Sequence, residues 1–188
     1  MKLSIVIPAY NEEKRIKPTL NDYVSFFTKK YGKDFEILVI LNGCKDKTLD
    51  IVKETSKKYH QIKYIDIKEK IGKGWSIIHG FRLSKGDLIG YADADNATKP
   101  KAFNDLIEKI NGFDGIVASR WIEGAKINKK QPLTRRIASR VFNIFIRVLF
   151  GIKIRDTQCG AKLFKKRAIV KILNELGITQ WAFDIDLL

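Results

Sequence analysis

Two aspartates, Asp93 and Asp95, are the residues whose type and spacing point most directly to chemistry. They follow an apolar run that ends at Tyr91-Ala92, and strand-like alternation would place both carboxylates on one side of the chain. Two neighbouring carboxylates repel each other unless a cation lies between them. Oxygen ligands suit Mg²⁺ or Mn²⁺, which combine one or two protein carboxylates with substrate phosphates. We therefore predict a metal and diphosphate site here, with an acidic turn before a helix at Lys99 as the alternative interpretation.

A second polar cluster, Pro8 to Glu13, ends the first apolar run of the chain. Tyr10 offers a ring that can stack on a base, and Glu12 can accept hydrogen bonds from a base or a ribose. The same residues also fit the start of a helix, with Asn11 as its cap and the two glutamates favourable to its dipole. The two roles are compatible, so this cluster is a candidate for nucleotide binding.

The segment from Lys70 to Gly74 combines glycines, which allow close backbone approach, with Lys73, which can bind a diphosphate at a predicted helix start. It lacks the spacing of a P-loop, and no GxGxxG motif follows the first predicted strand. The sequence therefore argues against a P-loop nucleotidase and against a dinucleotide-dependent dehydrogenase.

Basic side chains gather in the last third of the chain. The net charge is +15, and residues 120–171 hold 15 basic and two acidic residues, a net of +13. Arg120 follows a predicted strand, and Arg135, Arg136 and Ser139 lie at the start of a predicted helix, where guanidinium groups bind oxyanions well. A lysine-rich solvated surface is one interpretation. A surface that collects the phosphates of a nucleic acid, a lipid or a phosphorylated substrate is the one we favour.

Strands and helices alternate over the first 119 residues. Apolar patterns predict strands at 3–8, 35–41, 62–67, 87–92 and 115–118, and helices at 17–31, 48–59, 73–83 and 99–110. This alternation predicts an α/β fold with a Rossmann-like parallel sheet, covered by helices on both faces, that binds ligands at the carboxyl ends of its strands. Polar clusters at residues 10–13, 42–46 and 93–98 fall at three such ends. We therefore expect them to form one site.

The segment Leu133–Ile152 predicts a last long helix, which is apolar with interspersed arginines. Its apolar stretch is too short to cross a bilayer. It is either a well-buried helix of the domain or an amphipathic helix in the plane of a membrane surface, with its arginines towards the headgroups. Two acids near the end of the chain, Asp184 and Asp186, are either helix-start residues or active-site carboxylates.

No linker or repeat divides residues 1–188, so we predict a single domain. No secretory signal is visible, and two distant cysteines, Cys44 and Cys159, favour a reducing compartment.

A series of motifs occurs in a characteristic order: PAYNEE (8–13), NGCKDKT (42–48), IGKG (71–74), DADNATK (93–99), SRW (119–121), RRIASRVFN (135–143), RDTQCGAKLF (155–164) and WAFDIDLL (181–188). With these motifs the chain resembles family 2 glycosyltransferases of the GT-A fold, and most of all dolichyl-phosphate β-glucosyltransferases and the related mannose synthases. The resemblance spans essentially the whole chain. It implies a mostly parallel central sheet, a nucleotide-sugar half over residues 1–119 and an acceptor half over residues 120–188.

The residues and the resemblance together give three sets of candidate site residues. The nucleotide-sugar set is Pro8, Ala9, Tyr10, Glu12, Asn42, Asp46, Lys73, Asp93 and Ala94. The metal set, for Mg²⁺ or Mn²⁺, is Asp93 and Asp95. The catalytic set, which includes the groups for a lipid phosphate, is Asp95, Arg120, Arg135, Arg136 and Ser139.

Two departures from the family pattern bear on the donor. The family often has paired aspartates after the second strand, where this chain has Leu41-Asn42. Mannose synthases carry a glutamine metal ligand where this chain has Ala97, which favours the glucosyl branch.

The expected reaction is the transfer of glucose from UDP-glucose to a polyprenyl or dolichyl phosphate, with inversion. An ionised phosphate acceptor needs no strong general base, whereas a hydroxyl acceptor needs one, for which Asp184 or Asp186 is the candidate. The rival functions are a family 2 transferase that acts on a glycan or another hydroxyl, a mannose synthase that uses GDP-mannose and, more distantly, a basic nucleic-acid-binding module. A catalytically inactive homologue that only binds a sugar nucleotide is a further alternative, because the chain has Leu41-Asn42 in place of the paired aspartates. Carboxylates at the strand ends argue against a nucleic-acid partner.

We also expect peripheral attachment to the cytoplasmic face of a membrane through the helix Leu133–Ile152. Because similar enzymes continue past the position of Leu188, we expect a chain cut short, with membrane helices further along.

Overall fold

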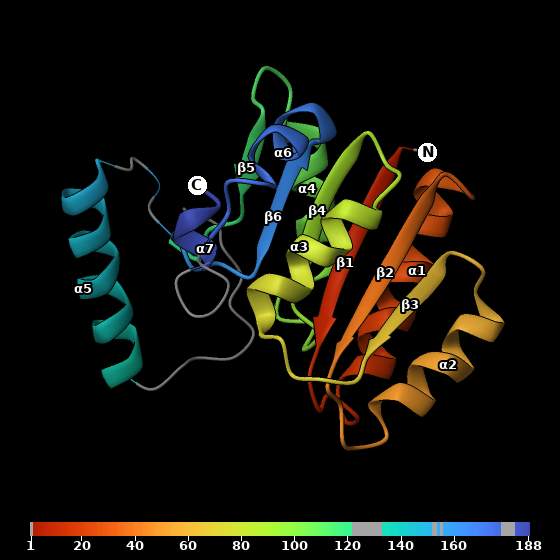
Figure 1. The fold of residues 1–188 in the computed structure, drawn as a ribbon. Coiled ribbons are helices and arrows are strands. Elements are labelled where there is room, and N and C mark those ends of the chain that lie inside the picture. Colours follow the sequence, from red (N-terminus) through yellow and green to blue (C-terminus); the bar gives the residue numbers. More distant parts are fainter. Residues whose placement is uncertain (1, 122–132, 152–153, 155, 178–182) are drawn as a thin grey trace.

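The apolar runs of the sequence form the strands of one mixed six-stranded sheet in the computed structural model (Figure 1). The structure describes residues 2–121, 133–151, 154, 156–177 and 183–188. Over residues 133–139 it describes only the helical backbone. The elements are, in chain order, β1 (Leu3–Ala9), α1 (Ile16–Tyr31), β2 (Phe35–Asn42), α2 (Thr48–Lys58), β3 (Ile62–Ile67), α3 (Lys73–Leu83), β4 (Leu88–Ala92), α4 (Pro100–Lys109), β5 (Gly115–Val117), α5 (Leu133–Phe150), β6 (Ala161–Lys165), α6 (Lys166–Ile172) and α7 (Phe183–Asp186).

The first four strands form the parallel part of the sheet, in the order β3-β2-β1-β4. Each of them leads into a helix, as the alternating pattern predicts. The chain builds outwards from β1 on one side and then returns to place β4 on the other side. In sheets of this kind, ligands bind in the crevice at the carboxyl ends of the strands where the order reverses. The topology therefore directs attention to the ends of β1 and β4.

Two apolar cores hold the helices against the sheet, because side chains alternate between its faces along each strand. In β1, Leu3, Ile5 and Ile7 belong to the core shared with α1, α2 and α4, whereas Val6 belongs to the core shared with α3, α6 and α7. All four side chains are fully buried. Burial of one side chain of this size contributes about 1.5–3 kcal/mol. Both faces of the sheet are thus covered, which confirms the predicted α/β class.

Strand β6 is the main difference from the sequence-based prediction, which contains no strand after residue 118. It lies between β4 and β5 and is antiparallel to both. The strand is only five residues long, follows Gly160 and includes a fully buried lysine, Lys162. A charged residue at an inward position breaks the apolar pattern by which the other strands are recognised.

Helix α5 lies at one side of the molecule, beyond α7 (Figure 1). Its apolar side chains are mostly exposed, between 59% and 81%, over the part whose side chains the structure describes: Val141, Ile144, Phe145, Val148, Leu149 and Phe150. Asn143 and Ile146 are its buried residues there. The alternative of a well-buried helix is therefore wrong for residues 140–150. No helix within the described ranges is both long and apolar enough to cross a bilayer.

Candidate active site

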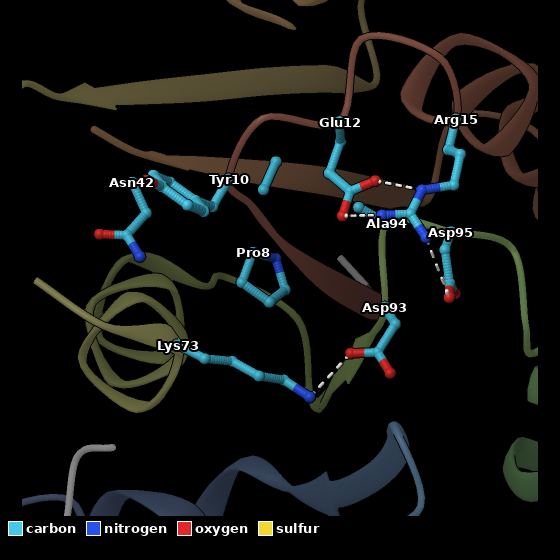
Figure 2. Close-up of a pocket in the computed structure, with 10 residues that line it drawn as sticks. Pro8, Tyr10, Glu12, Arg15, Asn42, Lys73, Asp93, Ala94 and Asp95 are labelled. Carbon is cyan, nitrogen blue, oxygen red and sulfur yellow. Dashed lines mark hydrogen bonds and ion pairs between the residues drawn. The ribbon is translucent and has the colours of Figure 1, made fainter. Parts of the chain in front are cut away.

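A pocket of about 270 Å³ opens at the carboxyl ends of β1 and β4, where the topology directs a ligand (Figure 2). It is lined by Pro8, Ala9, Tyr10, Glu12, Arg15, Asn42, Lys73, Asp93, Ala94 and Asp95. All of these except Arg15 belong to the nucleotide-sugar and metal sets predicted from the sequence. The polar clusters that follow β1, β2 and β4 therefore contribute to one cavity.

Asp46 and Thr48 stabilise the turn that follows β1 through two hydrogen bonds. The backbone N–H of Glu12 donates to Thr48 Oγ1 at 2.7 Å, and that of Glu13 donates to Asp46 Oδ2 at 3.1 Å. Burial alone would raise the pKa of Asp46, but hydrogen bonds from Thr48 and from the Glu13 backbone leave this pKa lowered. The sequence predicts that Asp46 contacts the nucleotide. The structure places it outside the residues that line the pocket, as the support of the Glu12 turn.

Tyr10 and Asn42 define the part of the pocket near the end of β2 (Figure 2). The Tyr10 side chain is partly exposed, and Lys70 Nζ lies 4.2 Å from the centroid of its ring. Asn42 is buried, and its Oδ1 accepts the backbone N–H of Ile71 at 2.7 Å. This hydrogen bond fixes the glycine-containing loop that precedes Lys73, so β2 positions the lysine at the start of α3.

Arg15 is a pocket residue that was not predicted from the sequence. Its guanidinium lies between two carboxylates, with Nε 2.6 Å from Glu12 Oε2, Nη2 2.8 Å from Glu12 Oε1 and Nη1 3.8 Å from Asp95 Oδ2 (Figure 2). Burial raises the pKa of Glu12, Arg15 opposes that effect, and the charges of Asp95 and Asp93 add to it. The available signal was the Glu-x-x-Arg spacing in the turn before α1, where the backbone N–H of Arg15 donates to Glu12 O at 2.9 Å.

Asp93 is paired with Lys73 and held by the turn before β6. Lys73 Nζ lies 2.8 Å from Asp93 Oδ1 (Figure 2). Burial lowers the pKa of Lys73, but the charges of Asp93 and then Asp184 outweigh burial and leave it raised. The Asp93 backbone N–H donates to Gly160 O at 3.1 Å, and a Cβ atom on Gly160 would lie only 1.8 Å from Asp93 Oδ2. A larger residue at position 160 would require this carboxylate to change its orientation.

The donor set of the pocket fits a divalent cation that takes most of its ligands from phosphate and water. Asp95 is the more available carboxylate, because its ion pair with Arg15 is long, at 3.8 Å. Asp93, by contrast, is engaged by Lys73. Among the described residues, no three His, Cys, Asp or Glu side chains gather around a point that a metal could occupy. A cation with one protein carboxylate and several phosphate oxygens matches the usual preference of Mg²⁺.

Arg120 is not among the residues that line this pocket and is anchored by Asp156. The Asp156 carboxylate is fully buried and accepts three hydrogen bonds from Arg120. The donors are the backbone N–H and Nε of Arg120, each at 2.9 Å, and Nη2 at 2.8 Å. The Trp121 ring lies near the guanidinium groups of both Arg120 and Arg140, at 5.8 and 4.8 Å from its centroid. The side chains of the other predicted phosphate-binding residues, Arg135, Arg136 and Ser139, lie outside the described ones.

A buried network with no counterpart among the sequence-based predictions joins β4, β6 and α7. Asp184, in α7, accepts hydrogen bonds from Lys162 of β6 and from the hydroxyl of Tyr91 of β4. Asp186 instead accepts the backbone N–H of Gly177 at 3.0 Å. The partners of the two acids are 9 to 93 residues away in sequence, so spacing gave no signal for these contacts.

The order of the strands belongs to the GT-A fold of glycosyltransferases. Solved glycosyltransferases share it: S. aureus TarS in complex with UDP superimposes with a TM-score of 0.67 at 18% identity, over 100% of this chain and 54% of that one. The mannosyltransferase PcManGT from Pyrobaculum calidifontis, in complex with GDP-Man and Mn²⁺, gives a TM-score of 0.63 at 15% identity, over 91% of this chain and 46% of that one. At these identities the likeness concerns the fold alone.

The chain belongs to Glycosyl transferase family 2, whose profile matches residues 4–173. It is 36% identical to a dolichyl-phosphate beta-glucosyltransferase of Dictyostelium discoideum, over 99% of this chain and 61% of that protein. It is 32% identical to the dolichyl-phosphate beta-glucosyltransferase of Homo sapiens, over 100% of this chain and 62% of that protein. The chain thus spans about three-fifths of the length of these relatives.

Proposed function

We propose that this chain transfers glucose from UDP-glucose to a polyprenyl phosphate, such as dolichyl phosphate, with inversion at the anomeric carbon. The observation that carries the proposal is the similarity to dolichyl-phosphate beta-glucosyltransferases over 98–100% of the chain. The pocket at the ends of β1 and β4 supports it, because that pocket combines an aromatic ring, carboxylates and a lysine within one cavity.

The donor half of the proposal assigns one task to each group in the pocket. Tyr10 stacks on the base, and Glu12 accepts hydrogen bonds from the ribose or the base. Lys73, at the start of α3, binds the diphosphate, where helix N–H groups also favour an anion. Asp93 keeps Lys73 in place through their 2.8 Å contact.

A divalent cation would be held by Asp95 and the diphosphate oxygens, with Asp93 as the second carboxylate of the predicted metal set. Bound there, Mg²⁺ or Mn²⁺ supplies positive charge that stabilises the leaving diphosphate. The positive charge of Arg15, whose Nη1 lies 3.8 Å from Asp95 Oδ2, partly compensates the negative charge of the same carboxylate.

In the transfer step, an oxygen of the acceptor phosphate forms a bond to the anomeric carbon, and the bond from that carbon to the diphosphate breaks. The nucleoside diphosphate leaves with the electron pair, and no proton has to be removed from an ionised phosphate. The engagement of the two candidate bases supports this acceptor. Asp184 is hydrogen-bonded to Lys162 and Tyr91, and Asp186 accepts a backbone N–H. A hydroxyl acceptor would need one of these carboxylates as a base.

Arg120 is the described residue that we assign to the acceptor phosphate, together with the predicted Arg135, Arg136 and Ser139. Asp156 binds the Nε and Nη2 edge of Arg120, so the guanidinium is held rigidly with its Nη1 edge directed elsewhere. A fixed guanidinium orients a phosphate well because its donors form a planar fork.

The acceptor carries a long apolar chain, and α5 offers a surface for the membrane in which that chain lies. Its exposed side chains include Ile144, Phe145 and Val148, the last of them 81% exposed. Arg140 and Arg147 are also exposed on this helix and suit anionic headgroups. In this proposal α5 lies in the plane of the cytoplasmic membrane surface, and the protein is peripheral there.

The test is a transfer assay with dolichyl phosphate, Mg²⁺ or Mn²⁺ and either UDP-glucose or GDP-mannose labelled in the sugar. We expect label from UDP-glucose in the organic-extractable lipid. Label only from GDP-mannose would overturn the donor, and label only in a water-soluble glycan would overturn the acceptor. Asp95→Asn should reduce transfer by about 100-fold or more with an unchanged unfolding transition.

A further inference from the structure

Lys162 is a charged side chain that the proposed reaction does not use, and it is fully buried in β6. It lies opposite Tyr91 of β4 in their antiparallel pairing. Its ammonium donates to the Tyr91 hydroxyl at 2.9 Å, to Cys159 O at 3.2 Å and to Asp184 Oδ1 at 2.5 Å. The Tyr91 hydroxyl donates to the same carboxylate. A buried lysine with this set of partners is held in one place, and its charge is matched by Asp184.

This ion pair lies close to the lysine of the donor pocket. The ammonium groups of Lys162 and Lys73 are 5.4 and 5.5 Å, respectively, from the centroid of the Tyr91 ring. Lys73 is also paired with Asp93, at 2.8 Å. Two cations and two carboxylates therefore surround one aromatic ring, and only one of the two pairs lines the pocket.

The two ion pairs influence each other. Burial lowers the pKa of Lys162, and the charge of Asp184 opposes that effect. Asp184 is also, after Asp93, one of the charges that raise the pKa of Lys73 against its own burial. Charges separated by several ångströms in a protein interior interact more strongly than in water, and salt screens them less. A diphosphate bound at Lys73 would therefore experience both members of the buried pair.

We propose that the Lys162–Asp184 pair sets the charge beneath the diphosphate part of the pocket, so that Lys162 strengthens diphosphate binding and Asp184 limits it. The inference rests on the proposed function only in taking a nucleoside diphosphate as the ligand. It differs from a purely structural role, in which the pair would simply attach α7 to the sheet. The two roles predict different signs, because loss of an attachment weakens binding whichever partner is removed.

The experiment measures the affinity for UDP, GDP and inorganic pyrophosphate by calorimetry at one fixed Mg²⁺ concentration. Lys162→Met should weaken binding of each diphosphate that the wild type binds by about threefold to tenfold, since it removes one positive charge. Asp184→Asn should strengthen binding by a similar factor at a pH at which the buried Lys162 keeps its proton, so this variant is measured from about pH 6 to about pH 8. The double variant should bind within about twofold of the wild type, since its net charge is unchanged.

A second ion pair, between a buried carboxylate and a lysine that is 45% exposed, provides the control. Glu36 is 3% exposed and lies 2.8 Å from Lys63 Nζ, but it is at the start of β2, whereas the pocket lies beyond the strand ends. Lys63→Met and Glu36→Gln should lower the thermal transition without changing diphosphate affinity.

Weaker binding by both Lys162→Met and Asp184→Asn, or no change in either, would overturn the inference. If Lys162→Met does not fold, tighter binding by Asp184→Asn still supports the inference, and unchanged or weaker binding still refutes it. Transfer to dolichyl phosphate is scored separately. If the wild type binds diphosphates but glucosylates no lipid, the proposed function is refuted and the charge effect is not. If the wild type binds none of the three probes, both are refuted.

Discussion

The approach of Gly160 to Asp93 allows a sharp test of how β6 contributes to the pocket. A Cβ atom on Gly160 would lie 1.8 Å from Asp93 Oδ2 and 2.5 Å from Asp93 Cγ. The two residues cannot separate freely, because Gly160 O accepts the Asp93 backbone N–H at 3.1 Å. We therefore expect Gly160→Ala to turn the carboxylate aside and to break its 2.8 Å contact with Lys73.

The cost in stability should be small, because the atoms that the Cβ would meet belong to a partly exposed side chain that can turn aside. A strained rotamer of Asp93 would lower the unfolding free energy by about 0.5–1.5 kcal/mol. The ion pair adds little, because Lys73 and Asp93 are 42% and 35% exposed and solvent screens them. Transfer should fall more steeply, by about 10-fold to 100-fold, since a displacement of about 1 Å in an active site has effects of that order.

The assays are urea unfolding and glucose transfer to dolichyl phosphate, with Gly177→Ala as the matched control. A Cβ atom on Gly177 would meet no atom within 4 Å. This control should stay within about 0.5 kcal/mol of the wild type. If Gly160→Ala matched the control in both assays, Asp93 would not depend on the close approach of β6.

Three further predictions concern the metal ligand, a buried carboxylate and α5. Asp95→Asn should weaken Mn²⁺ binding in the presence of UDP by at least about tenfold in calorimetry, because it removes the more available carboxylate of the pocket; unchanged binding would remove its role as a ligand. Glu36→Gln should cost about 1–3 kcal/mol at pH 7 in urea unfolding. Burial raises the pKa of Glu36, but hydrogen bonds and an ion pair leave it below its ordinary 4.5, so this difference should persist above about pH 4.5 and shrink as the pH falls further. A difference that grew on acidification would contradict the assignment. Val148→Asp with Ile144→Asp should reduce sedimentation with anionic vesicles by about tenfold or more, whereas the same change in net charge on α2, Lys57→Gln with Lys58→Gln, should have a smaller effect; equal losses would indicate a purely electrostatic attachment.

The parallel part of the sheet could be predicted from the sequence because three of its strands, β1, β2 and β4, are buried on both faces. Runs such as Phe35–Asn42, in which every residue is buried, contrast clearly with the polar turns around them. The helices between them have regular three- and four-residue spacing, so their ends are predicted within about two residues. Strand β6 has neither advantage, because it is short and places Lys162 at an inward position.

The residues of the pocket could be predicted for the same topological reason. A residue that directly follows a predicted parallel strand lies at the ligand-binding edge, so the sequence pattern alone groups Tyr10, Glu12, Asp93 and Asp95. Arg15 could not be grouped with them, because its ion pair with Glu12 resembles an ordinary exposed pair at a helix start. Asp46 follows β2 in the same manner, but its carboxylate is taken by Thr48 and by a backbone N–H.

The boundary between donor and acceptor halves in the sequence does not separate the two parts of the site in the fold. A boundary at residue 119 divides the sequence into a donor half that carries most of the acidic residues and a strongly basic acceptor half. In the fold, β6 from the second half returns to pair with β4, so Gly160 contacts Asp93 and Lys162 lies against Tyr91. The segment that holds Arg120 through Asp156 leads directly into this strand. The residues that we assign to the acceptor are thereby connected to the wall of the donor pocket through one short antiparallel strand, which is the part of the sheet that the sequence pattern concealed.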